Sequence, residues 1–311
     1  MQSNNPLIIA VWETAIRGFR SWLELDLGLR ANSVDAYVRD VTRLQFFAAN
    51  KAEEPFTPAN IQAKHVEGFL VQLFDEGLSP SSQSRILSGL RNFSRYLQVE
   101  KIISGDPLEL IDAPRPERKL PDVLSIEEVG LIIDAIDLYS KEGIRNRAIL
   151  ETMYSCGLRV SEVVTLRISL IDEVEGMVRV LGKGNKERLI PIGQTTLDTI
   201  VRYIEEYRNF LEIEAGCEDT LFLGRRGREL TRQIVSTIFR RAAIESGIRK
   251  SVSSRTFRHS LATHLMESGA DISLVQEMLG HASITTTEVY THIDQRYLRD
   301  QIMRFHPREQ S

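Results

Sequence analysis

The chain contains few cysteines and no long apolar run. Only Cys156 and Cys217 occur among its 311 residues, and their separation fits neither a disulfide framework nor a zinc-binding motif. No run of about 18 apolar residues is present, which excludes a transmembrane helix. The short apolar stretch at residues 7–12 lacks a preceding positive charge, which argues against a signal peptide. We therefore expect a reduced, cytoplasmic protein with no membrane partner.

The overall charge gives little support for nucleic-acid binding, but the distribution of charge does. A hydrophobic content of 42% and a charged content of 26% are close to globular averages, so disorder is disfavoured. The net charge is −4. Between residues 223 and 259, however, ten basic residues are opposed only by Glu229 and Glu245. Such a window attracts a phosphate backbone, although a solvated basic face is the simpler alternative.

Four amphipathic helices are predicted between residues 10 and 110. The first covers about residues 10–25, Asn32 and Ser33 supply the N-cap of the second, and Thr57 with Pro58 opens the third. The fourth begins at Ser79, with apolar residues on one face. No strand pattern interrupts this region. We expect residues 1–111 to form a helical bundle.

A proline-rich segment separates this bundle from the rest of the chain. Pro114, Pro116 and Pro121 lie among charged residues, and this composition cannot continue a helix. We therefore assign residues 112–123 to a linker and residues 124–311 to a second domain. The length of the chain is sufficient for each domain to bury its own core.

The second domain is predicted to be mainly helical with one small antiparallel sheet. Residues 175–181 and 187–191 have strand character, and the Gly-Lys-Gly-Asn-Lys segment between them favours a hairpin with a cationic tip. A capped helix start is predicted at Ser125, with Glu128 at the capping-box offset. Helical patterns cover about residues 143–156, 194–215 and 232–246, and another begins near Ser161. Two further short helices are expected to meet at Gly269.

A set of motifs towards the C-terminus carries the chemistry. Residues 251–292 contain Arg258, a Leu-Gly-His turn ending at His281, and Tyr290 nine residues later. Upstream, Arg159 lies in Gly-Leu-Arg-Val-Ser-Glu, and Lys183 lies at the predicted hairpin tip. This pattern resembles the tyrosine recombinases (the phage integrase superfamily), and its turn and Tyr-Thr-His ending are most similar to the bacterial Xer subgroup. The resemblance implies a SAM-like core-binding bundle followed by a mainly helical catalytic domain.

The resemblance also implies a role for each residue of the motifs. Arg159 and Arg258 would bind the scissile phosphate, with Glu162 supporting that region, and His281 would hydrogen-bond the phosphate. Tyr290 would attack the phosphorus, and Lys183 would protonate the leaving 5′-oxygen. These residue types suit the chemistry, because planar guanidinium groups stabilise charge on phosphoryl oxygens and a lysine can donate a proton. The reaction conserves bond energy in a phosphotyrosine, so no cofactor and no metal are expected.

One position departs from the family pattern. The family usually has histidine three residues before the second arginine, whereas this chain has Arg255. A guanidinium group stays protonated at neutral pH and cannot accept a proton, but it can still donate hydrogen bonds to phosphate. We retain Arg255 as a site residue and expect slower or conditional catalysis. His259 and His264, five residues apart, do not share the spacing of a metal site.

The expected partners also follow from the resemblance. The two domains would hold double-stranded DNA, with Arg85, Arg91, Arg95 and Arg232 as candidate phosphate contacts. The family acts as a tetramer, either of one chain or with a second recombinase, and a septal DNA translocase is the implied activator. The apolar strip of the C-terminal tail (Leu298, Ile302, Met303 and Phe305) suits docking into a neighbouring protomer, with self-packing as the alternative. Tyr297 is expected to pack rather than react.

Three alternative functions remain open. A type IB topoisomerase shares the chemistry, but the compact helical N-terminal module and the tail disfavour it. A catalytically silent DNA-binding homologue is kept open by Arg255. An integrase of a mobile element would carry the same motifs as a recombinase that resolves chromosome or plasmid dimers.

Overall fold

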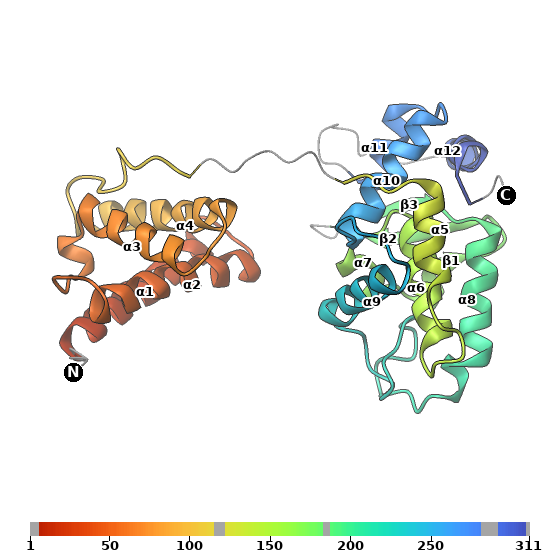
Figure 1. The fold of residues 1–311 in the computed structure, drawn as a ribbon, viewed down its shortest axis with the longest axis horizontal. Helices are drawn as coiled ribbons and strands as arrows, with labels where there is room; N and C mark the ends of the chain where they lie inside the picture. Colours follow the sequence, from red (N-terminus) through yellow and green to blue (C-terminus); the bar gives the residue numbers. More distant parts are fainter. Residues whose placement is uncertain (1–5, 115–121, 183–186, 281–291, 309–311) are drawn as a thin grey trace. The chain divides into compact units, whose positions relative to one another are not determined.

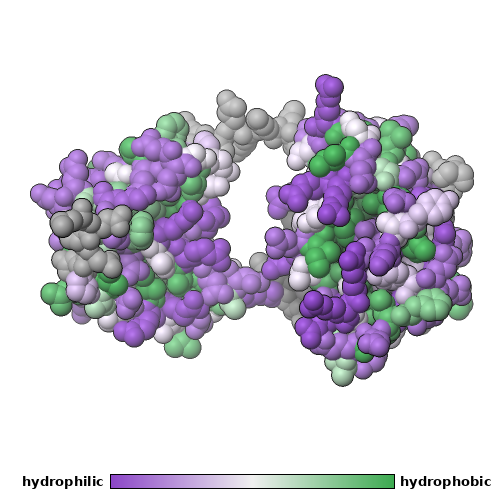
Figure 2. Space-filling model, turned by 60° about the horizontal axis from the view of Figure 1, so that its bottom comes forward, coloured by the Kyte–Doolittle hydropathy of each residue, from purple (hydrophilic) through white to green (hydrophobic). Residues whose placement is uncertain are grey.

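The computed structural model describes residues 6–114, 122–182, 187–280 and 292–308, and of residues 292–296 it describes only the backbone. The chain divides into two compact units, Met1–Lys119 and Leu120–Ser311. Hydrophilic side chains cover most of the face of each unit that Figure 2 shows. Within the described ranges, no helix has both the length and the apolar character needed to cross a membrane.

The first unit consists of four helices, as predicted (Figure 1). They are α1 (Pro6–Leu25), α2 (Ala31–Asn50), α3 (Ala63–Asp75) and α4 (Pro80–Val99), with a 3₁₀ turn over Pro58–Asn60. The Ser79 hydroxyl accepts a hydrogen bond from the Ser82 N–H at 3.3 Å and caps α4 as expected.

Two predicted helix starts in this unit are wrong. Arg30, not Asn32 or Ser33, occupies the N-cap of α2, and its carbonyl accepts from the Ser33 and Val34 N–H groups. Thr57 caps only the 3₁₀ turn, because the following Ile61 is extended. α3 therefore begins after Gln62. In both places a local cap signal was present, but the backbone conformation nearby decided where the helix began.

An aromatic cluster holds the first unit together. The Trp12 ring stacks on Phe93 with centroids 5.8 Å apart, and the Trp12 indole N–H donates to the Phe56 carbonyl at 2.9 Å. Phe19 meets Phe93 edge-on at 5.2 Å. These rings are fully buried, so they join α1, α4 and the loop before α3 in one core.

The second unit is built around α6 (Gly143–Ser155), as Figure 1 shows. Its apolar residues are buried on every side, and the helix contacts α5, α7, α8, α9 and α10. The surrounding helices are α5 (Ile126–Asp134), α7 (Val160–Val164), α8 (Gln194–Glu206), α9 (Arg232–Glu245), α10 (Ser254–Glu267), α11 (Ile272–Leu279) and α12 (His292–Phe305). The predicted meeting of two helices at Gly269 is confirmed, because α10 ends and α11 begins on either side of it.

The predicted hairpin forms part of a three-stranded antiparallel sheet in the order β1-β2-β3. Its strands are β1 (Ile171–Asp172), β2 (Met177–Leu181) and β3 (Glu187–Pro191), and a 3₁₀ turn over Ile168–Leu170 precedes β1. Val180 pairs with Arg188 across β2 and β3. The sequence did not indicate β1, because two residues are too few to establish a strand period. The hairpin tip, residues 183–186, lies outside the described residues.

The helix predicted for residues 194–215 is shorter than expected. α8 ends at Glu206 and is followed by a 3₁₀ turn over Arg208–Phe210. The Arg208 side chain is buried and donates to the Glu218 carbonyl at 2.5 Å and to the Thr220 carbonyl at 2.9 Å. A charged side chain can be buried only with such partners, so the chain turns where Arg208 reaches these carbonyls.

The C-terminal helix packs against its own chain. Leu298 and Ile302 are buried in the core of the second unit. Beyond α12, His306 is fully buried and its Nε2 hydrogen-bonds the Ser155 carbonyl at 3.0 Å, while Arg308 pairs with the buried Glu151 at 2.5 Å. Leu298 and Ile302 thus pack within their own chain, and docking of the strip into a neighbouring protomer stays a prediction. The expectation that Tyr297 packs is wrong, since 58% of its surface is exposed.

The buried His306 side chain makes the free energy of unfolding depend on pH. Burial lowers the pKa of His306 from 6.5 to about 4. The unfolded chain therefore binds more protons than the folded chain between these values. The stabilising contribution is complete above pH 6.5 and is lost as the pH falls towards 4. Between pH 7 and pH 5 we expect the free energy of unfolding to fall by about 2 kcal/mol on account of His306.

The measurement is denaturant unfolding followed by far-ultraviolet circular dichroism at pH 7 and pH 5. His306→Gln keeps a hydrogen-bond donor for the Ser155 carbonyl but does not titrate in this range, so its pH dependence should be smaller than the parent's by that amount. An equal pH dependence in both proteins would contradict the assignment.

Candidate active site

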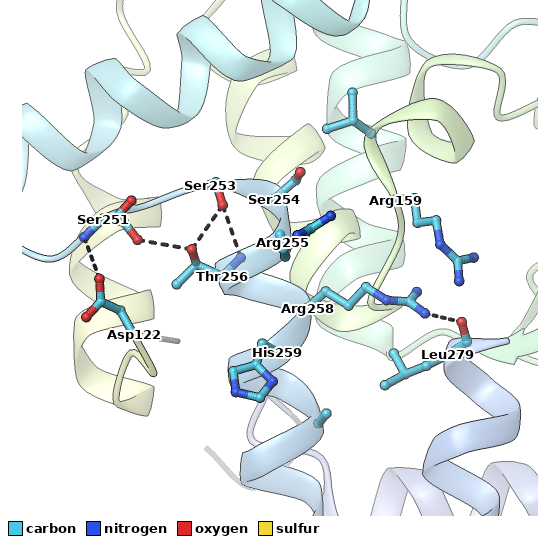
Figure 3. Close-up of a pocket in the computed structure, with 12 residues that line it drawn as sticks. Asp122, Arg159, Ser251, Ser253, Ser254, Arg255, Thr256, Arg258, His259 and Leu279 are labelled. Atoms are coloured by element: carbon cyan, nitrogen blue, oxygen red, sulfur yellow. Dashed lines mark hydrogen bonds between the residues drawn. The ribbon is translucent and has the colours of Figure 1, made fainter. Parts of the chain in front are cut away.

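An open cavity of about 830 Å³ lies where the start of α10, the start of α7 and the end of α11 meet (Figure 3). Its lining includes three predicted site residues, Arg159, Arg255 and Arg258. The structure thus brings together residues that lie about a hundred positions apart in the sequence.

Arg258 reaches the cavity from α10. The Ser253 hydroxyl caps this helix by accepting from the Thr256 N–H at 3.2 Å. The Arg258 guanidinium donates to the Gly157 carbonyl at 2.5 Å and to the Leu279 carbonyl. Burial, and then the nearby positive charge of Arg159, lower the pKa of Arg258 to about 10. The side chain therefore remains charged at neutral pH and is held at two points.

Arg159 lies at the N-cap of α7. Its backbone N–H and its guanidinium both donate to the Glu162 carboxylate, each at 2.8 Å. The guanidinium also donates to the Gly280 carbonyl at 3.1 Å. The side chain is 41% exposed. These contacts occupy two of the five N–H groups of the guanidinium, so the fork is oriented while part of it faces solvent.

Glu162 is the buried carboxylate of this cluster, with a side chain only 3% exposed. Burial by itself raises the pKa of Glu162, but hydrogen bonds and charge from Arg188, followed by bonds from Arg159, outweigh it and lower the pKa overall. Glu162 is therefore ionised at neutral pH. The guanidinium groups of Arg159 and Arg188 bind this one carboxylate, and its charge also acts on the nearby Arg258. The cluster has an excess of positive charge and suits an anion.

Three consecutive carbonyls at the end of α11 accept from these three arginines. Arg188 Nε donates to the Met278 carbonyl at 2.9 Å, and Arg258 and Arg159 donate to the carbonyls of Leu279 and Gly280. Gly280 ends the helix in the left-handed conformation, with φ of +64°. The last carbonyls of a helix have no partner within it and carry partial negative charge, so arginines satisfy them well.

Three of the predicted catalytic residues lie outside the described residues. His281 and Tyr290 both lie within residues 281–291, and Lys183 lies within residues 183–186. Their roles remain predictions. The described part of the chain therefore contains three of the predicted catalytic residues, Arg159, Arg255 and Arg258.

Arg255 lies on the first turn of α10 and is exposed to solvent. It lines the same cavity as Arg258, which follows it by one helical turn (Figure 3). Residues three apart on a helix face the same side. Arg255, the residue that departs from the family pattern, therefore lies beside Arg258, a candidate for binding the phosphate.

Two of the four predicted DNA contacts already have partners within the first unit. Arg85 binds both oxygens of the buried Asp40 carboxylate at 2.7 Å, and Arg91 donates to the Ile111 carbonyl at 2.9 Å. Arg95 is exposed on α4, and Arg232 is exposed at the start of α9. Contact with DNA stays a prediction for all four.

The predicted basic window is exposed, but part of its charge is balanced from elsewhere. Arg225 pairs with Glu142, Arg228 pairs with Glu214, and Lys250 pairs with Glu128 at 2.6 Å. These three acids lie outside residues 223–259, so a count within the window overstates the local positive charge.

Sequence reasoning missed two features of the site. The first is Arg188, whose signal was its position on β3: it is in phase with the buried Ile190 and therefore points inwards. The second is the attachment of Leu124 to α10. The Leu124 N–H donates to the Ser260 hydroxyl at 2.9 Å, and the Leu124 carbonyl bonds His264 Nε2 at 2.8 Å. No local pattern indicates this contact.

His264 has a structural role. Its Nδ1 hydrogen-bonds the Tyr154 hydroxyl at 2.7 Å, so both ring nitrogens are used within the core. Among the described residues, no group of three or more His, Cys, Asp or Glu side chains could hold a metal ion.

Comparison with known proteins agrees with this geometry. Residues 122–296 match the phage integrase family, and residues 16–101 match the phage integrase N-terminal SAM-like domain. The chain therefore belongs to the phage integrase family and is a tyrosine recombinase.

Within this family the similarity is to Xer-type recombinases. The chain is 42% identical to the tyrosine recombinase XerD of Oceanobacillus iheyensis over 297 residues, which cover 95% of this chain and 99% of that protein. It is 38% identical to XerD of Staphylococcus haemolyticus, with the same coverage. The predicted function as a Xer-type site-specific recombinase that exchanges DNA strands by transesterification is thus confirmed at the level of the family.

Solved structures support the fold. XerH site-specific recombinase bound to a palindromic difH substrate aligns with a TM-score of 0.68 at 22% identity, over 96% of this chain and 97% of that chain. A lambda integrase (75–356) dimer bound to a COC′ core site aligns with a TM-score of 0.69 at 20% identity, over 90% of this chain and 98% of that chain. The predicted fold, a SAM-like helical domain and a catalytic domain with a small antiparallel sheet, is confirmed.

The ion pair of Arg85 yields a test that separates folding from DNA binding. Arg85→Ala leaves the buried Asp40 carboxylate without its partner, so we expect it to lower the free energy of unfolding by about 2–3 kcal/mol. Arg95→Ala, on the same helix, should change it by less than about 0.5 kcal/mol.

Denaturant unfolding of both variants measures the stability, and DNA affinity is measured separately by fluorescence anisotropy. Equal stability losses would show that the Asp40 pair does not matter for folding.

Proposed function

We propose that the arginine cluster binds the scissile phosphate of a recombination site and that Tyr290 attacks it. The observation that supports this is the convergence of Arg159 and Arg258 on the carbonyls of Leu279 and Gly280, immediately before His281. An excess of fixed positive charge suits the charge that develops on phosphoryl oxygens. The two arginines are held by contacts within the protein, so little reorganisation is needed when a phosphate binds.

The reaction follows from these roles. The Tyr290 phenol loses its proton to solvent as its oxygen forms a bond to phosphorus, the bond from phosphorus to the 5′-oxygen breaks, and Lys183 donates a proton to that oxygen. The product is a 3′-phosphotyrosine and a free 5′-hydroxyl. Attack by the 5′-hydroxyl of a second strand reverses the chemistry and releases Tyr290. His281 hydrogen-bonds the phosphate in both steps.

The proposed biological role is the resolution of chromosome or plasmid dimers. Similarity to XerD over nearly the whole chain supports it. DNA binding and assembly of a recombinase tetramer are typical of the family; this chain would act within a synaptic tetramer, alone or with a second recombinase, and a septal DNA translocase would activate it. Because its substrate is chromosomal or plasmid DNA, we place the protein in the cytoplasm. A mobile-element integrase is the alternative role.

A second candidate function rests on Arg255. An exposed guanidinium in the cavity, where the family has histidine, can bind phosphate but cannot accept a proton. A homologue that binds its site and cleaves slowly or not at all is consistent with that replacement.

The test uses a suicide duplex from the dimer-resolution site of the source genome, nicked near the cleavage position. A covalent protein–DNA adduct is detected on a denaturing gel. We expect a slow adduct with the parent, none with Tyr290→Phe, and about 100-fold faster formation with Arg255→His, since a positioned proton-transfer group contributes on that order.

The controls define the other outcomes. If the parent binds the duplex but only Arg255→His reacts, the chain is a disabled recombinase. If no variant reacts on a duplex that all of them bind well, the proposed chemistry is wrong.

A further inference from the structure

Arg188 is an enclosed arginine of the site, with a side chain only 11% exposed. It extends from β3, the strand that follows the hairpin tip. Its two terminal nitrogens donate to the two Glu162 oxygens at 2.9 and 2.8 Å, and its Nε donates to the Met278 carbonyl at 2.9 Å. One side chain thus joins the sheet, the start of α7 and the end of α11.

The bidentate contact determines how Glu162 is oriented. A carboxylate that receives both donors of a guanidinium is fixed in the plane of that group. The same two oxygens accept from the Arg159 guanidinium and from its backbone N–H. The position of the Arg159 fork therefore depends on the plane that Arg188 imposes on Glu162.

Arg188 also determines how the end of α11 is placed. A Cβ atom at Gly280 would lie 3.1 Å from the Arg188 Cδ and 3.2 Å from its Nε. The backbone of Gly280 is therefore packed against the Arg188 side chain. The carbonyl of Gly280 accepts a hydrogen bond from Arg159, and Gly280 is the residue directly before His281 in the sequence.

We propose that Arg188 is a positioning residue for recombination: it does not touch the DNA, but it orients Arg159 through Glu162 and fixes the end of α11 directly before His281. This rests on the proposed role of Arg159 at the scissile phosphate. Arg179 provides a matched comparison, because it lies on the neighbouring strand β2 and pairs with Glu187 at 3.6 Å but has a side chain that is 54% exposed.

The experiment measures binding, so it does not depend on cleavage. The full-length chain is titrated with two duplexes that differ only at the scissile position, one with the natural phosphodiester and one with an uncharged methylphosphonate. In the parent, loss of that charge should weaken binding about 10-fold, the effect of one charge-assisted hydrogen bond. Arg188→Gln should reduce this discrimination to about 2-fold by the same arithmetic, and Arg179→Gln should leave it unchanged.

A double variant identifies the route of the effect. If Arg188 acts through Arg159, then Arg188→Gln combined with Arg159→Ala discriminates no worse than Arg159→Ala alone. Additive losses, or full discrimination in Arg188→Gln, overturn the proposal. Arg188→Lys keeps the charge but loses the fork; if Arg188→Gln does not fold, the Lys variant must show the loss, and normal discrimination in it also overturns the proposal.

The covalent-adduct assay distinguishes this failure from failure of the proposed function. A parent that forms the adduct while Arg188→Gln discriminates normally refutes only the role of Arg188. A parent that neither discriminates nor forms the adduct refutes both.

Discussion

The capture of the α11 carboxyl end by three arginines is the interaction on which the site depends. Each carbonyl from Met278 to Gly280 accepts a hydrogen bond from a different arginine, and the three side chains come from β3, α10 and the start of α7. Like charges brought this close repel each other, so the arrangement requires the buried Glu162 and the negative end of a helix. Three guanidinium groups near one carboxylate leave the cluster with an excess of positive charge, and the negative charge of a phosphodiester balances it.

A second constraint links α10, the helix that carries Arg258, to the first residues of the second unit. Leu124 is bonded to both Ser260 and His264 on α10, two and six residues beyond Arg258. Lys250 donates to the Val123 carbonyl at 2.9 Å, and the Ser251 N–H donates to Asp122 at 3.2 Å. The last two residues of the predicted linker, Asp122 and Val123, and Leu124 after them are thus fixed to the segment that carries Arg258.

Much of the fold followed from local patterns, because capping residues and apolar spacing act over a few positions. Ser79 and Ser125 began helices where expected, and the hairpin between β2 and β3 formed as predicted. The end of α8 could not be predicted from local patterns, because Arg208 is held by carbonyls ten or more residues away in the sequence. In the site, Arg159 and Arg258 were found through motif resemblance. The buried role of Arg188 was missed, because its bonds to Glu162 and Met278 span 26 and 90 positions.

The central claim is that these arginines serve a phosphate attacked by Tyr290, and peptide mapping of the covalent adduct tests it most directly. Trypsin releases residues 259–296 as one peptide whose single tyrosine is Tyr290, whereas Tyr297 falls in the next peptide. After nuclease digestion of a trapped complex, mass spectrometry should find the nucleotide on the peptide of residues 259–296. A nucleotide on the peptide that contains Tyr297, or on any other peptide, would contradict the account.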